Sequence, residues 1–157
     1  VSRGLGDVYK RQAVGPLGEK GKLLMSFHGI PQASSDRGDP YEAQCRETAR
    51  LIAEELGLPA DAWTLSFQSK FGRAKWLEPA SIDTAKRLAS EGVERLDVVC
   101  PGFAADCLET IEEIGDELKG IFLAAGGKTF HYIPAMNAQP EAVAAYAAIV
   151  KSAVAGA

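Results

Sequence analysis

A histidine directly follows an apolar run in the segment Ser26-Phe27-His28-Gly29-Ile30-Pro31. A neutral imidazole accepts a proton near pH 7 or ligates a divalent metal, so His28 suits acid–base or metal chemistry. A hydrogen-bonded histidine that merely ends a strand is an equally good interpretation of this position. The second histidine, His131, lies inside an aromatic run, where packing in a sheet is the favoured interpretation.

A run of acidic residues follows a later apolar segment. At 100° per residue, one helix face would carry Asp106, Glu109, Glu113 and Asp116 or Glu117, opposite an aliphatic face. Like charges four residues apart are mildly unfavourable unless a cation visits them. The alternative is structural: Asp106 as N-cap with Glu109 at N3 resembles a capping box, and the other acids are typical of a solvated face.

Cations and aromatic residues gather in the segment from Gln68 to Pro79. It contains Lys70, Arg73 and Lys75 together with Phe71 and Trp76. Cations can hold carboxylates, and an indole can stack on a flat ligand. A solvated basic loop with one packed tryptophan is the alternative interpretation.

Composition excludes several classes of function. The 157 residues include 17 Lys and Arg against 21 Asp and Glu, a net charge of −4 that does not favour nucleic-acid binding. Three cysteines without CxxC spacing form neither a complete disulfide framework nor a four-cysteine metal site, which favours a reducing cytoplasm. No apolar run reaches the length of a membrane span, and no glycine-rich phosphate motif follows a strand.

Short apolar runs alternate with helical patterns along the chain. Strands are expected at Leu23–Phe27, Trp63–Phe67, Leu96–Cys100 and Thr129–Ile133. Helices are expected at about Pro40–Leu56, Pro79–Ser90, Cys107–Lys119 and Pro140–Val154. This alternation predicts an α/β fold, with an open, Rossmann-like parallel sheet of about four strands flanked by helices.

An open α/β sheet forms its site outside the carboxyl ends of its strands. The segments that leave those ends contain the histidine, the basic aromatic loop and the start of the acidic helix. We therefore expect these three features to converge at one edge.

Residues 1–21 follow no strand or helix period, so we interpret them as an unstructured or foreign leader before a domain at 22–157.

Taken together, these segments resemble ferrochelatases, and the sequence from Cys100 to Glu113 is most similar to the proteobacterial type. Ferrochelatases are lyases that insert ferrous iron into protoporphyrin IX in the last step of haem synthesis. The resemblance runs from about Lys22 to Val154. Four segments in the same order carry it: Ser26–Pro31, Arg37–Tyr41, Ser66–Lys70 with Trp76–Pro79, and Cys100–Glu113.

The resemblance implies roles for individual residues. It makes His28 and Glu109 the catalytic pair that also contacts the metal, with Glu113 and Asp106 on an accompanying path for protons or metal. It further implies porphyrin-binding positions at Phe103, Trp76, Ser69 and Lys70. Ferrous iron and protoporphyrin IX would be the substrates. Some ferrochelatases hold a [2Fe–2S] cluster through four cysteines, but three cysteines without a cysteine-rich extension predict no cluster and no prosthetic group here.

Length is the main departure from the family. A ferrochelatase is about twice as long and has two similar α/β halves. This chain resembles only the C-terminal half of such a protein, a chelatase-type α/β domain. The missing N-terminal half is therefore an expected partner, the fragment alone is expected to be inactive, and peripheral membrane association is a further expectation. The alternatives are a half that binds porphyrin without turnover, and a cobalt chelatase, which would carry more metal-binding histidines.

Overall fold

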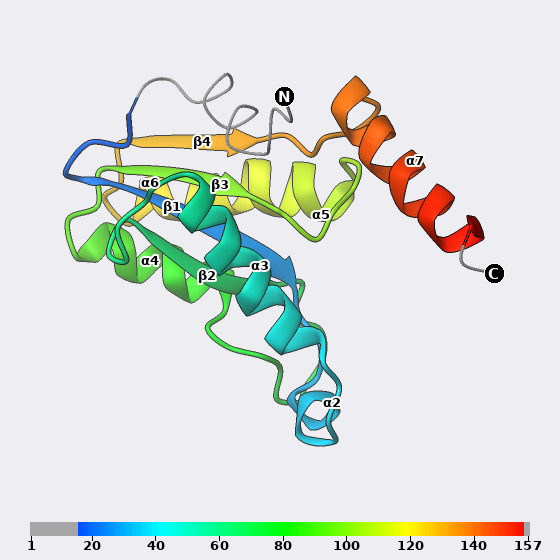
Figure 1. Cartoon of the computed structure of the whole chain (residues 1–157). Helices are drawn as coiled ribbons and strands as arrows, with labels where there is room; N and C mark the ends of the chain where they lie inside the picture. Colours follow the sequence, from blue (N-terminus) through cyan, green and yellow to red (C-terminus); the bar gives the residue numbers. More distant parts are fainter. Residues whose placement is uncertain (1–15, 156–157) are drawn as a thin grey trace.

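A computed structural model describes residues 16–155 and contains one parallel sheet (Figure 1). Its strands are β1 (Gly21–His28), β2 (Trp63–Gln68), β3 (Arg95–Val99) and β4 (Thr129–Ile133). They lie in the order β2-β1-β3-β4, and all pairs are parallel. The predicted fold class is confirmed, and each expected strand differs from the observed one by at most two residues at either end.

The helices follow the predicted alternation. They are α2 (Gln32–Asp36), α3 (Tyr41–Glu55), α4 (Ser81–Ser90), α5 (Leu108–Thr110), η1 (Ile111–Leu118), α6 (Lys119–Ala124) and α7 (Pro140–Ala155). The short helix α2 was not expected from the sequence. The helix expected at Cys107–Lys119 continues to Ala124 and is a π-helix over η1, where the backbone bonds run from i to i+5.

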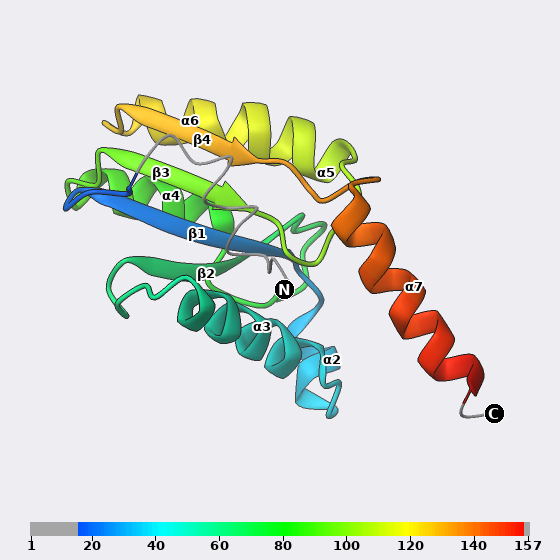
Figure 2. The same cartoon turned by 45° about the horizontal axis from the view of Figure 1, so that its top comes forward.

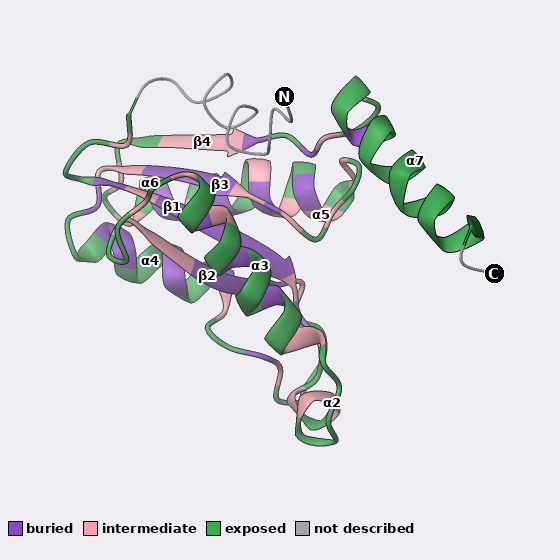
Figure 3. Ribbon diagram, in the orientation of Figure 1, coloured by how far each residue is buried: buried purple, intermediate pink, exposed green. Residues whose placement is uncertain are grey.

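Helices cover both faces of the sheet (Figures 2 and 3). On one face, Leu24 and Val98 of the strands pack with Leu88 of α4, Ile114 of η1 and Phe122 of α6. On the other face, Met25 and Phe67 pack with Cys45 and Ala49 of α3. Alternate residues of β1 therefore enter opposite cores, as expected for a central strand buried on both sides.

The last helix, α7, leaves this body. It points away from the sheet in Figures 1 and 2, and Ala142 is its only buried residue among those that the structure describes. Large apolar side chains of α7, including Val150 and Val154, are exposed. Within residues 16–155, none of the helices combines the length and the apolar character that crossing a bilayer requires.

The expected leader lies mostly outside the described residues, which begin at Pro16. The described part contacts the domain: Leu17 packs against the core on the α3 side, and Lys20 forms an ion pair with Glu94 at 2.8 Å. Strand β1 begins at Gly21, one residue before the expected boundary of the domain.

Candidate active site

His28 is the last residue of β1, at the carboxyl edge of the sheet. Its Nδ1 lies 2.7 Å from the carbonyl oxygen of Gly29. Since a carbonyl only accepts, Nδ1 carries the proton in this contact, so the lone pair of the neutral form of the ring is on Nε2. The ring also lies beside that of Phe103, with centroids 6.5 Å apart. This tautomer leaves one nitrogen able to accept a proton or bind a metal.

The turn after His28 is closely packed. A Cβ atom on Gly29 would lie 2.9 Å from the carbonyl oxygen of Gln68 and 3.1 Å from Cε3 of Trp76. The Tyr41 hydroxyl donates to the carbonyl oxygen of His28 at 2.9 Å. The backbone on both sides of the imidazole is therefore fixed by neighbouring strands and by α3.

Glu109 lies in α5, at the first turn of the long helix. A hydrogen bond from Cys107, the helix N-terminal backbone and the nearby charge of His28 together hold the pKa of Glu109 below its ordinary value. The two residues are linked through Gln68, which lies opposite His28 in register and donates from its side chain to the carbonyl oxygen of Glu109 at 2.6 Å. An anionic carboxylate near an imidazole can take up a proton or attract a cation.

The expected capping box between Asp106 and Glu109 is wrong. The N-cap is Cys107, whose N–H donates to Oγ1 of Thr110 at 3.0 Å, so Thr110 occupies N3 and Glu109 occupies N2. The helix starts one residue later than expected because Asp106 is engaged elsewhere. Glu109 is consequently not tied to the helix N-terminus by a reciprocal cap.

Asp106 joins the start of α5 to the loop after β4. Its carboxylate accepts hydrogen bonds from the Tyr132 hydroxyl, the Asn137 amide, the Ala135 N–H and the Thr110 hydroxyl. Burial raises the pKa of Asp106, but these donors outweigh it and hold the pKa below its ordinary value. These contacts give Asp106 a connecting role that the sequence did not indicate.

Glu113 of η1 contacts the end of β2. Its carboxylate accepts from the backbone N–H and from the hydroxyl of Ser69, each at 2.6 Å. Ser69 has a positive φ of 63°, which is uncommon for a residue other than glycine. These two hydrogen bonds compensate for the unfavourable backbone conformation at the point where the loop leaves the strand.

A cavity of about 620 Å³ lies between the end of β2, the start of α4 and the acidic helix. Four residues singled out from the sequence line it: Ser69, Lys70, Glu109 and Glu113. Its other lining residues include Gln68, Phe71, Asp83, Leu108, Glu112 and Glu117. Carboxylates dominate its polar part, which suits a cation, whereas exposed Phe71 and Leu108 offer apolar surface.

Trp76 and Phe103 do not line this cavity. Trp76 lines a separate space of about 210 Å³ with Gly29 and Lys70, and Phe103 lines an apolar space of about 230 Å³ on the α3 side. The Trp76 backbone pairs with Pro31, so the basic loop packs against the exit from β1. Phe103 therefore lies beside His28, and Trp76 lies beside the next residue, Gly29.

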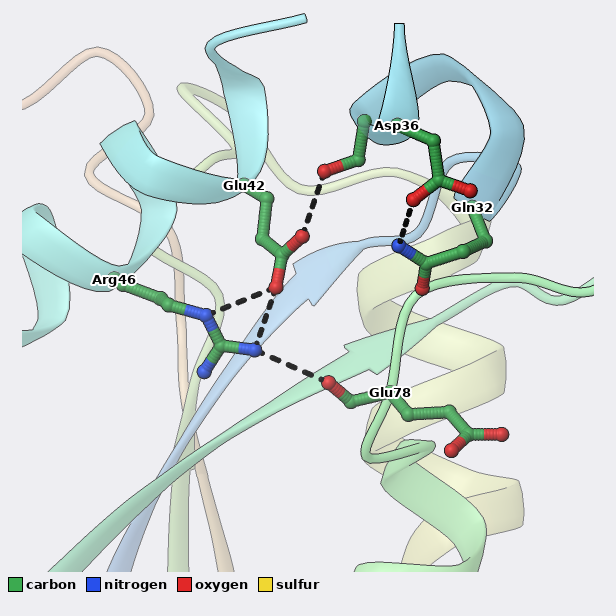
Figure 4. A network of polar contacts seen from close by, with 6 residues as sticks. Gln32, Asp36, Glu42, Arg46 and Glu78 are labelled. Atoms are coloured by element: carbon green, nitrogen blue, oxygen red, sulfur yellow. Dashed lines mark hydrogen bonds and ion pairs between the residues drawn. The ribbon is translucent and has the colours of Figure 1, made fainter. Parts of the chain in front are cut away.

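The basic loop is also attached to α3. Figure 4 shows Arg46, which binds the Glu42 carboxylate at 2.7 Å and donates to the carbonyl oxygen of Glu78 at 3.3 Å. Glu42 also accepts from the hydroxyl of Ser35 in α2. The contacts connect α2, α3 and the end of the loop, so the segment around Trp76 has support on both sides.

His131 does not join the site. It lies within β4, opposite Asp97 in register, as the sheet-packing interpretation expected. Its Nδ1 is buried without a hydrogen-bond partner among the described residues. In the same part of the chain, no group of three or more His, Cys, Asp or Glu side chains is arranged to hold a metal ion.

Comparisons with known proteins identify the family. The ferrochelatase family model matches residues 6–154. The chain belongs to the ferrochelatase family. It is 54% identical over 135 residues to the ferrochelatase of Aromatoleum aromaticum and 49% identical over 145 residues to that of Dechloromonas aromatica. These matches cover 86% and 92% of the chain but only 37% and 40% of the two ferrochelatases.

A solved structure shows the same fold. The match is a putative cobalamin biosynthesis CbiX protein from Marinobacter aquaeolei, with a TM-score of 0.54 and 17% identity. It covers 87% of this chain and 98% of that protein. The likeness concerns the fold alone. The expected resemblance to ferrochelatases of the proteobacterial type is confirmed by the sequence comparisons, and the chain spans less than half of the relatives' length.

Proposed function

We propose that this chain is the C-terminal part of a ferrochelatase, and that the full-length protein inserts ferrous iron into protoporphyrin IX. The observation that carries the proposal is the link between His28 and Glu109 through Gln68, which lies opposite His28 in register and donates to the carbonyl oxygen of Glu109. Family membership supplies the substrate class, because every relative described above is a ferrochelatase.

The reaction requires proton acceptors and a route for a cation. Ferrous iron replaces the two pyrrole N–H protons of the porphyrin, so two protons leave for each iron that enters. His28 is the proposed proton acceptor and transient iron ligand, because its Nε2 keeps a lone pair. Glu109 is the proposed carboxylate partner, since its lowered pKa keeps it anionic.

The cavity supports a path to Glu109. Glu109 and Glu113 line it together with Glu112 and Glu117, so an incoming Fe²⁺ would meet oxygen ligands along η1. The Glu113 carboxylate accepts two hydrogen bonds from Ser69. Asp106 precedes the first turn of the helix, and its carboxylate accepts hydrogen bonds from four donors. We therefore assign Glu113 to the path and give Asp106 the supporting task of fixing the helix.

Porphyrin contacts form the second part of the proposal. Phe103 lies beside His28 and Trp76 beside Gly29, while Ser69 and Lys70 line the cavity with Glu109. Aromatic faces suit a macrocycle, and Lys70 can bind a propionate. The remaining wall of the porphyrin pocket would come from the N-terminal part of the protein.

We also propose a cytoplasmic location, because all three cysteines are free thiols. Peripheral membrane association is a further prediction.

The test uses a full-length fusion, in which residues 20–157 replace the matching C-terminal part of the Aromatoleum aromaticum ferrochelatase. Anaerobic Fe²⁺ and protoporphyrin IX are mixed with the fusion, and loss of porphyrin fluorescence reports metallation. The unmodified relative is the assay control. Porphyrin binding without metallation would favour the binding half, and preferential insertion of Co²⁺ into sirohydrochlorin would favour a cobalt chelatase.

A further inference from the structure

Gln68 is a buried polar residue that the resemblance did not single out as a site residue. It ends β2, lies opposite His28 in register and is 3% exposed. Its side-chain amide nitrogen donates to the backbone carbonyl of Glu109 at 2.6 Å and lies 3.5 Å from a carboxylate oxygen of Glu113. One side chain therefore connects the sheet edge to the helix start that carries the proposed carboxylate.

The amide oxygen of Gln68 is held as firmly as its nitrogen. It accepts from the Ser26 hydroxyl at 2.8 Å and from the Cys100 thiol at 3.5 Å. Ser26 is within hydrogen-bond distance of Ser81, and Ser81 of Ser66, at 2.9 and 2.8 Å. Ser26 and Ser66 are fully buried, and Ser81 nearly so. These contacts fix the orientation of the Gln68 amide, because its oxygen faces donors and its nitrogen faces acceptors.

We infer that Gln68 is the positioning residue that sets the location of Glu109 relative to His28. The inference rests on the proposed function. The carbonyl that Gln68 holds belongs to Glu109 itself, just before the helix changes to i→i+5 bonding at Ile111. The first turn of a helix is less constrained than its interior, so an outside contact has most effect there.

The consequence of removing this contact is local. Without the Gln68 amide, the Glu109 carbonyl loses a donor, and the first turn can shift while the aliphatic face of η1 remains packed. A misplacement of about 1 Å in a catalytic group can lower a rate by roughly 100-fold. We therefore expect Gln68 variants to reduce turnover more than porphyrin affinity.

The test compares two Gln68 variants in the full-length fusion. Gln68→Met removes both the donor and the acceptor, whereas Gln68→Glu keeps the shape and the acceptor for Ser26 but cannot donate to the Glu109 carbonyl. Steady-state metallation with Fe²⁺ and protoporphyrin IX should show kcat lowered on the order of 10- to 100-fold in both variants. The KM for protoporphyrin should stay within about twofold, because the porphyrin-contacting side chains are unchanged.

Ser66→Ala is the matched control, because Ser66 lies at the far end of the same buried chain and contacts neither Glu109 nor Glu113. It should lower the melting temperature and leave kcat near that of the parent. If both Gln68 variants fold and turn over at the parent rate, or if Ser66→Ala loses as much kcat as they do, Gln68 is a stability residue only. A parent fusion that binds porphyrin but never metallates would overturn the proposed function as well, which separates the two failures.

Discussion

The Tyr132 hydroxyl donates a hydrogen bond to the Asp106 carboxylate at 2.6 Å. Tyr132 belongs to β4, and Asp106 precedes the helix that carries Glu109, so this contact ties the end of the last strand to the start of the acidic helix. Asn137, which adopts a positive φ of 50°, donates to the same carboxylate from the loop that leads to α7. The position of the helix start thus depends on residues that follow it in the chain.

Replacing Asp106 should weaken the fold in a pH-dependent way. Asp106→Asn removes the charge that accepts these hydrogen bonds, and should lower the free energy of unfolding by about 1–3 kcal/mol at neutral pH. The pKa of Asp106 is lowered in the folded state, so its contribution is complete above the ordinary value of 3.8 and is lost as pH falls below it. Urea unfolding at pH 6 and at about pH 3 measures this. The difference between parent and variant should shrink at the lower pH, and an equal difference at both would contradict the assignment.

The histidine at the end of β1 should be essential for turnover but not for folding. His28→Ala removes the free Nε2 and little packing, because the side chain is only partly buried. In the full-length fusion, metallation should fall by at least about 100-fold while the melting temperature stays close to that of the parent. His131→Gln is the control, since it changes the only other histidine and should keep activity. Activity near the parent level in His28→Ala would refute the catalytic assignment.

Glu109 should matter for turnover and little for stability. Glu109→Gln keeps the shape of the side chain and removes its charge, so it loses the attraction to His28 that contributes to the lowered pKa. Metallation by the full-length fusion should drop at least about tenfold, without a clear change in melting temperature. Asp116→Asn serves as the matched control, because this carboxylate lies on the same helix but outside the cavity lining. Equal rates for the two variants would mean that the acids form only a solvated face.

The fold was predictable because strand and helix periods alternate without interruption. Strand β4, at Thr129–Ile133, has the expected bounds, since apolar and aromatic residues end there at Pro134. That the end of β1 and the start of the acidic helix lie at the same edge was also predictable, because parallel strands bring their carboxyl ends to one edge. The hydrogen-bond partners of the individual side chains at that edge were harder to infer.

Two features of the site could not be read from local patterns. The acidic face was predicted at 100° per residue with Asp116 or Glu117 at its end, and Glu117 does line the cavity. Glu112, which was not predicted on that face, also lines the cavity, since the π-helical bonding from Ile111 changes the rotation per residue. Asp106 was expected on the acidic face, and its donors Tyr132 and Asn137 lie 26 and 31 residues away in sequence. Such contacts depend on tertiary structure, as does the burial of Gln68.

The isolated chain should not metallate protoporphyrin at a useful rate. A pocket for a wide planar ligand must bury most of its surface, and this chain spans only 37% of the Aromatoleum aromaticum relative. With one wall, the ring is poorly oriented, and the positioning contribution of roughly 7–11 kcal/mol is largely lost. An anaerobic assay on residues 16–157 measures this. Robust turnover by a monomer would refute the argument, whereas turnover by a dimer would mean that a second copy supplies the missing wall.

The isolated chain should also self-associate through α7. Its exposed apolar side chains include Val143, Tyr146, Val150 and Val154, at spacings of three and four residues that place them on one face. A continuous apolar stripe of this kind favours contact with another protein surface, and in the isolated chain the available surface is a second copy. Val150→Lys combined with Val154→Lys should convert concentration-dependent association into a monomer, as measured by size-exclusion chromatography with light scattering. Ala148→Lys with Ser152→Lys adds the same charge at the same spacing on the opposite face, and should leave association unchanged. If both double variants dissociate equally, general charge repulsion explains the result, and the stripe on α7 is not the contact surface.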